Sequence, residues 1–171
     1  MRRLRAVLLA AIVLGACSSN GGSAKSTSSS SSVAPAGNAA CALINQSGGV
    51  DNGGGPTKFP DGSSGKTENC TFQQGAVRID VALFSGSTSG PSAYFAQILA
   101  AATSMDPKPT DVDAGENAFV NNEFGYVLQS GKMAQIEYSA DIGSKTPQEA
   151  RDFYVQNLTP LLTTAARNMQ G

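Results

Sequence analysis

Residues 76–85 read Ala-Val-Arg-Ile-Asp-Val-Ala-Leu-Phe-Ser, and this stretch decides the kind of fold that the chain can form. Apolar side chains recur at every second position from Val77 to Leu83, through Ile79 and Val81, with Arg78 and Asp80 between them. Such alternation predicts a β-strand with one buried face. Residues 69–72 carry a second strand signal, and the intervening Gln74-Gly75 pair predicts that the two strands form a β-hairpin.

Periodic segments on the C-terminal side add more strands and two helices. Strand signals follow at residues 117–120, 123–129 and 132–140. One helix is expected near Pro91 and ends before Asp106-Pro107, whereas a second begins with the capping box at residues 146–149. Pro160 is expected to kink or restart that second helix. We therefore predict an α+β fold, an antiparallel sheet of about five strands with two main helices packed on one face.

The N-terminal residues have the pattern of an export signal. Three arginines at positions 2, 3 and 5 precede the apolar run 6–16, which is shorter than the roughly 20 residues that span a bilayer. Leu14-Gly15-Ala16-Cys17 resembles a bacterial lipobox, whose cysteine is acylated when the leader is removed. We therefore expect residues 1–16 to be a signal peptide rather than a buried helix. Cys17 would then anchor the protein by covalent lipid to the extracytoplasmic face of the cell membrane.

The segment that follows predicts a tether and then one domain. Nine serines and no aromatic residue lie between Ser18 and Asn38, so this stretch cannot bury enough apolar surface to offset its ordering entropy. Residues 17–38 are therefore expected to be the lipidated cysteine and a flexible Ser-rich linker. Residues 39–171 remain, which is the size of a single domain.

The cysteine count predicts one disulfide. Acylation of Cys17 leaves the even pair Cys41 and Cys70, which an exported, oxidising environment would join. A two-cysteine metal site and a reactive free thiol are the alternatives, but the chain has no histidine and no CxxC spacing to complete a zinc shell. We expect a short helix within residues 38–46. The glycine-rich stretch 47–66 has no periodicity and is expected to be a long loop closed by the disulfide.

The charge balance argues against a nucleic-acid partner. Loss of the three leader arginines lowers the basic count from 12 to 9, against 13 acidic residues, and gives a mature net charge of about −4. No stretch concentrates lysine or arginine. A basic surface that binds nucleic acid, or one that binds anionic lipid by charge alone, is therefore not expected.

The sequence contains no catalytic signature. Without histidine, Ser-His-Asp and Cys-His arrangements are impossible. Residues 62–67 resemble the end of a phosphate-binding loop, but Pro60 stands where its first glycine belongs, so a turn is expected. Asp111, Asp113 and Glu116 hint at a calcium loop but miss its spacing, and we interpret them as a solvated acidic turn. No catalytic residue, metal ligand or cofactor is predicted.

Taken together, several short motifs resemble those of a known kind of protein. They are the lipobox, the Ser-rich tether, Cys41-Ala42-Leu43-Ile44, Cys70-Thr71-Phe72 and the segment Asp113–Phe119 before a hairpin and a final amphipathic helix. In this combination the chain is similar to secreted actinobacterial lipoproteins of uncharacterised function. Their domain looks related in plan to extracellular sensor-like domains of some mycobacterial kinases and lipoproteins. The resemblance implies an envelope role and an α+β fold, and it carries over no catalytic residues.

The function expected from these observations is non-catalytic binding of an envelope ligand, which includes apolar ones, or of a partner protein. The alternative is a hydrolase of cell-wall glycan or lipid that uses paired carboxylates, although the 13 acidic residues give no reason to choose two. A ligand site is expected between the sheet and the loop 47–66, unless that loop binds nothing. Four aromatics fit either a pocket or the core: Phe84, Phe119, Phe124 and Tyr126.

Replacement of the lipidated residue tests the anchor. Cys17→Ser removes the acyl acceptor, so the protein should leave the membrane fraction while its domain still folds. Fractionation of labelled cells after a high-salt wash measures this, with Ser19→Ala as the matched control that keeps the lipobox. If the Cys17→Ser protein stays in the washed membrane pellet, the lipobox interpretation is wrong.

Overall fold

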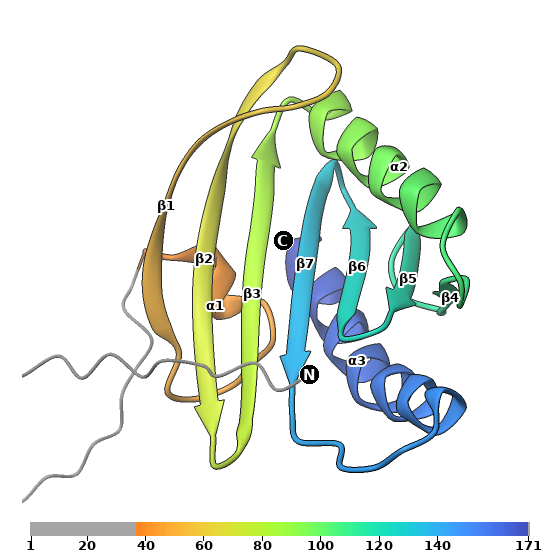
Figure 1. Cartoon of the computed structure of the whole chain (residues 1–171). Helices are drawn as coiled ribbons and strands as arrows, with labels where there is room; N and C mark the ends of the chain where they lie inside the picture. Colours follow the sequence, from red (N-terminus) through yellow and green to blue (C-terminus); the bar gives the residue numbers. More distant parts are fainter. Residues whose placement is uncertain (1–36, 171) are drawn as a thin grey trace, which may run out of the picture. The chain divides into compact units, whose positions relative to one another are not determined.

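The computed structural model describes residues 37–170, which form one seven-stranded antiparallel sheet with three helices (Figure 1). The strand order across the sheet is β1-β2-β3-β7-β6-β5-β4. The elements in chain order are α1 (Ala39–Ala42), β1 (Val50–Lys58), β2 (Ser64–Gln74), β3 (Val77–Gly86), α2 (Ser89–Thr103), β4 (Thr110–Asp111), β5 (Asn117–Asn121), β6 (Phe124–Gln129), β7 (Lys132–Ser139) and α3 (Pro147–Met169). The predicted α+β class with an antiparallel sheet is confirmed.

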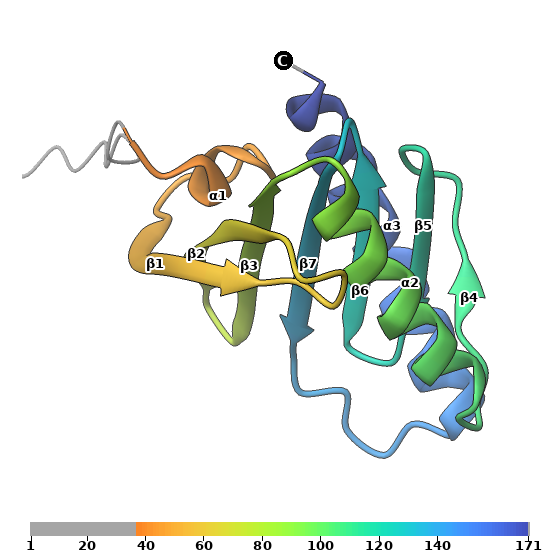
Figure 2. The same cartoon turned by 90° about the horizontal axis from the view of Figure 1, so that it is seen from above.

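The two long helices lie on opposite faces of the sheet, as Figure 2 shows. Ile79, Val81 and Leu83 of β3 belong to a core that also contains Leu158 and Leu162 of α3. Their neighbour Phe84 points the other way, into a second core with Phe95 of α2. The expectation of both helices on one face therefore does not hold. The face that carries Arg78 and Asp80 becomes apolar towards Phe84. This apolar part is buried by α2.

The larger core fills the space between the sheet, α3 and α1. Phe72, Ile136, Leu158, Leu162 and Met169 are among its fully buried side chains. Full burial of each such side chain contributes roughly 1.5–3 kcal/mol. The smaller core, beneath α2, contains Phe95, Phe119, Leu128 and Met133, and it occupies only one end of the opposite face.

The prediction of a long loop at residues 47–66 is wrong, because most of this segment forms strand β1 and the start of β2. Val50 pairs with Thr71 and Lys58 pairs with Ser64, with an irregularity between Asp51 and Gly54. The side chains of β1 are exposed almost throughout. An edge strand held by backbone hydrogen bonds rather than by burial needs no hydrophobic alternation, and therefore gives no periodic signal.

Helix α3 begins as predicted and then passes through its proline. Thr146 accepts a hydrogen bond from the Glu149 amide, and the Glu149 carboxylate accepts from the Thr146 amide, which completes the capping box. Pro160 lies inside the continuous helix and does not restart it. Pro160 is exposed, and water can satisfy the carbonyl group that loses its helical donor.

The predicted disulfide is confirmed, and it joins α1 to β2. The Cα atoms of Cys41 and Cys70 are 5.1 Å apart, with a sequence separation of 29. Both cysteines are buried in the larger core. The bond therefore fixes the N-terminal end of the domain to the strand next to the edge strand β1.

The predicted signal peptide, the predicted lipidation site Cys17 and all but the last residues of the predicted linker fall within 1–36, outside the described residues. Within 37–170, no helix is both long enough and apolar enough to cross a membrane.

Removal of the disulfide should lower stability without changing the fold. The double variant Cys41→Ala, Cys70→Ala increases the conformational entropy of the unfolded chain. This should lower the free energy of unfolding by about 3.5 kcal/mol. Denaturant titration measures it, with the reduced wild type as control. Equal stability of variant and wild type would contradict a closed native bond, as would two freely alkylated thiols in the unreduced protein.

Candidate functional site

A groove crosses the part of the sheet that α2 leaves uncovered. It consists of two adjoining hollows. Asn69 and Ala82 line one of them. Thr67 and Phe84, each two positions away on the same strand, line the other. We call the hollow of about 220 Å³ over β2, β3 and β7 the polar end. The hollow of about 600 Å³ between the β1–β2 hairpin and α2 is the aromatic end. Residues of the β1–β2 hairpin line one side of the aromatic end, and Tyr94 and Gln97 of α2 line the other. Figure 2 shows the course of these two elements.

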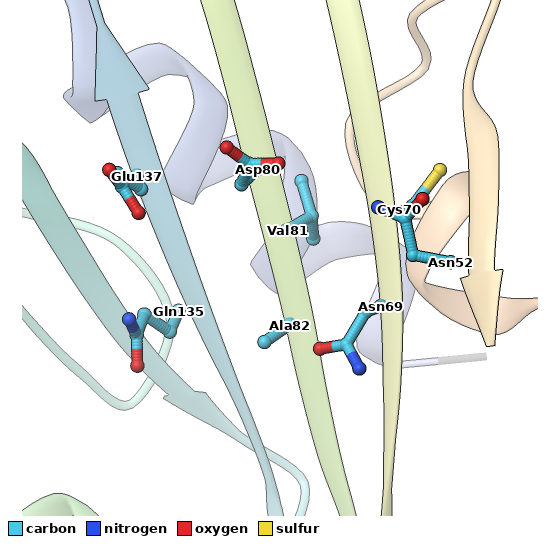
Figure 3. Close-up of a pocket in the computed structure, with 8 residues that line it drawn as sticks. All are labelled: Asn52, Asn69, Cys70, Asp80, Val81, Ala82, Gln135 and Glu137. Atoms are coloured by element: carbon cyan, nitrogen blue, oxygen red, sulfur yellow. The ribbon is translucent and has the colours of Figure 1, made fainter. Parts of the chain in front are cut away.

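Two rows of side chains form the floor of the polar end. Asp80 of β3 stands directly opposite Glu137 of β7, and in the next row Ala82 lies between Asn69 and Gln135 (Figure 3). Side chains directly opposite on paired strands have Cβ atoms about 5 Å apart. The small side chain of Ala82 leaves a depression between two planar amides, where a larger residue would fill the floor.

A chain of hydrogen bonds holds Asp80 in place. The Asn52 amide donates to the Thr71 hydroxyl at 2.6 Å, and Thr71 donates to Asp80. Arg78 donates to both carboxylate oxygens of Asp80, at 2.7 and 3.0 Å. Partial burial raises the pKa of Asp80, but the hydrogen bonds from Arg78 and Thr71 outweigh it, and the net pKa lies below the ordinary value. Asp80 is therefore ionised at neutral pH and is engaged by the protein itself.

Phe59 closes the aromatic end by packing against two glycines. A Cβ atom built on Gly90 would lie 2.3 Å from the Phe59 ring, and one on Gly65 would lie 2.5 Å from it. Only residues without side chains at these positions allow the hairpin tip to contact the first turn of α2. Next to this contact, Phe84 and Tyr94 meet edge to face with ring centroids 5.2 Å apart.

Tyr126 of β6 continues the row of Asn69, Ala82 and Gln135 across the sheet. It stands directly opposite Gln135 and stacks on Phe119 with ring centroids 4.8 Å apart. Burial raises the pKa of Tyr126 to about 12, with smaller contributions from Tyr94 and the nearby glutamates. The Tyr126 hydroxyl is therefore protonated at neutral pH and can donate a hydrogen bond.

The structure separates the residues that the sequence singled out. Asp111, Asp113 and Glu116 do not form a cation site, since no group of three or more acidic or cysteine side chains in residues 37–170 could hold a metal ion. Residues 62 and 63 end the turn between β1 and β2, and residues 64–67 begin β2, so the predicted turn covers only the first part of this segment. Phe84 and Phe119 belong to the core under α2, and Tyr126 packs against it.

Sequence reasoning did not select the polar end. Asp80, Gln135 and Glu137 all lie in correctly predicted strands, on the faces opposite the apolar ones. The alternation of side chains along each strand could have indicated which of these residues share a face of the sheet. Only the pairing of β3 with β7 places Asp80 beside Glu137. In contrast, residues 57–60 of the glycine-rich segment do line the aromatic end, as part of the hairpin.

No family model, curated protein or solved structure matches this chain.

A glycine substitution tests how the hairpin wall is held. Gly90→Ala should force Phe59 away from α2 and lower the free energy of unfolding by about 1–3 kcal/mol, although alanine is the better helix former. Gly55→Ala is the matched control, because a Cβ there meets open space. Denaturation and hydrogen exchange of the hairpin amides measure both effects. Equal stability and protection in the two variants would contradict the proposed contact.

Proposed function

We propose that this protein is a non-catalytic binding module, anchored by lipid on Cys17 at the outer face of the cell membrane, which holds an envelope ligand in the groove. The observation that carries the proposal is the groove itself. The opposite face of the same sheet is covered by α1 and α3, whereas this face is hollowed and lined by half-buried polar and aromatic side chains. Concave sites with a few convergent polar groups are the usual places of ligand binding.

The place where the chain enters the domain supports this arrangement. Asn38 donates to Asp51 and to the carbonyl oxygen of Asn69, and α1 follows at once in the core opposite the groove. The tether therefore joins the domain on the side away from the α2 face.

The hydrolase alternative has one observation in its favour, the juxtaposition of Asp80 and Glu137. Cβ atoms about 5 Å apart can bring two carboxyl groups to the spacing of retaining glycosidases, about 5–5.5 Å. Such enzymes need one protonated carboxyl group as the acid and one ionised carboxylate as the nucleophile. The lowered pKa of Asp80 does not suit the acid role, and both oxygens of Asp80 already accept hydrogen bonds from Arg78, which leaves neither free to attack a sugar. The arrangement therefore favours binding over hydrolysis.

Filling the floor of the groove tests the proposal. Ala82→Leu places a larger side chain between Asn69 and Gln135 and should abolish binding of an envelope component to the detergent-solubilised mature protein. The matched control is Ala100→Leu on the exposed side of α2. Binding is measured separately against envelope glycan, lipid and protein fractions.

The outcomes separate the two functions. Loss of binding in Ala82→Leu alone supports the proposal, whereas binding to no fraction, or equal binding by both variants, contradicts it. Turnover of the glycan or lipid fraction by the wild type, lost in Glu137→Gln, would favour the hydrolase instead.

A further inference from the structure

We propose that the ligand of the groove is a neutral, extended oligosaccharide. This inference rests on the proposed binding function and names its ligand class. Three features of the groove support this ligand class: the charge of the groove, the hydrogen-bonding groups of its floor and the aromatic surface at one end.

The charges at the polar end favour a neutral ligand. Its lining contains the carboxylates of Asp80 and Glu137, and the nearby Arg78 is already paired with Asp80. An anionic ligand would therefore meet the carboxylate of Glu137, which forms no salt bridge within residues 37–170. A metal ion has too few ligands here, since the described residues contain no group of three acidic or cysteine side chains at one place.

The floor presents the hydrogen-bonding groups that sugar hydroxyls require. Asn69 and Gln135 each offer both donors and acceptors, Glu137 offers acceptors, and the protonated Tyr126 lies beside Gln135. Asn69 and Gln135 lie on strands two apart, which separates them by roughly 9.5 Å. A sugar ring can rest over the depression at Ala82 with its hydroxyls directed to the amides on both sides.

The aromatic end suits the apolar face of a second sugar. Phe84 and Tyr94 line it beside Thr67 and Gln97, so apolar and hydrogen-bonding surface alternate over a short distance. The C–H groups of a sugar ring pack on aromatic rings while its hydroxyls reach polar neighbours. Two adjoining hollows of about 220 and 600 Å³ suit a chain of sugars better than a single one.

Two other occupants fit less well. A peptide added as a strand needs free backbone groups, but β2, β3 and β7 are paired on both sides. An acyl chain needs a continuous apolar lining, whereas the polar end is lined by amides and carboxylates. The side chains of the floor therefore favour a ligand that is itself rich in hydroxyl groups.

Calorimetric binding of defined oligosaccharides tests the inference. The probes are short neutral oligomers of glucose, galactose, arabinose or N-acetylglucosamine, with a uronic-acid oligomer as the charged comparison, added to the solubilised mature protein. At least one neutral oligomer should bind, and the charged oligomer should bind more weakly. Gln135→Leu should weaken binding at least about fivefold because it removes the amide. Gln156→Leu, on the exposed side of α3, is its matched control.

Variants of the aromatic end give an independent measurement. Tyr94→Ala should weaken binding about tenfold, whereas Tyr94→Phe, which keeps the ring, should bind within about twofold of the wild type. Circular dichroism and thermal unfolding establish that each variant is folded. If Tyr94→Ala does not fold, the comparison of Gln135→Leu with Gln156→Leu still decides.

The outcomes distinguish this inference from the proposed function. If no neutral oligomer binds, or if Gln135→Leu binds as well as the wild type, the oligosaccharide inference is wrong. If the wild type then binds lipid vesicles or an envelope protein fraction and the Ala82→Leu variant does not, the proposed binding function holds with another class of ligand. If the wild type binds none of these, or if Ala82→Leu binds them equally well, both the oligosaccharide inference and the proposed binding function are wrong.

Discussion

The arrangement of the domain depends on the two unlike faces of the central strand β3. One face is apolar from Val77 to Leu83 and supports the core under α1 and α3. The other changes along its length, from the ion pair of Arg78 and Asp80, through the small Ala82, to the buried Phe84. Because α2 covers only the apolar end, the change at Ala82 marks where helix packing stops and the polar end of the groove begins.

Much of the fold could be predicted from local patterns. Strand β3 alternates because most of it buries one side, and α2 and α3 have helical spacing for the same reason. Strands β5–β7 instead carry short apolar runs, because α2 and α3 cover their two faces. Strand β1 could not be found in this way, because its side chains are exposed and its partners are backbone groups of β2. The choice of faces for the two helices depends on which strands pair, and residues far apart in sequence decide that.

The candidate site was less accessible to sequence reasoning than the fold. Counting cysteines predicted the bond between Cys41 and Cys70, because that argument needs only chemistry and compartment. The pair of Asp80 and Glu137 depends on the register between β3 and β7, which no local signal specifies. Likewise, Gly90 looks like an ordinary helix-start residue until the Phe59 ring is placed against it.

The disulfide also determines how the domain would carry mechanical tension. A pull on the chain before Asn38 reaches Cys41 and passes through the covalent bond directly to Cys70 in β2. Residues 42–69, which include β1 and the hairpin tip, lie outside this load path. A ligand held over β2 and β3 would therefore resist the pull along a short route through these two neighbouring strands, while the hairpin wall of the groove stays unstretched.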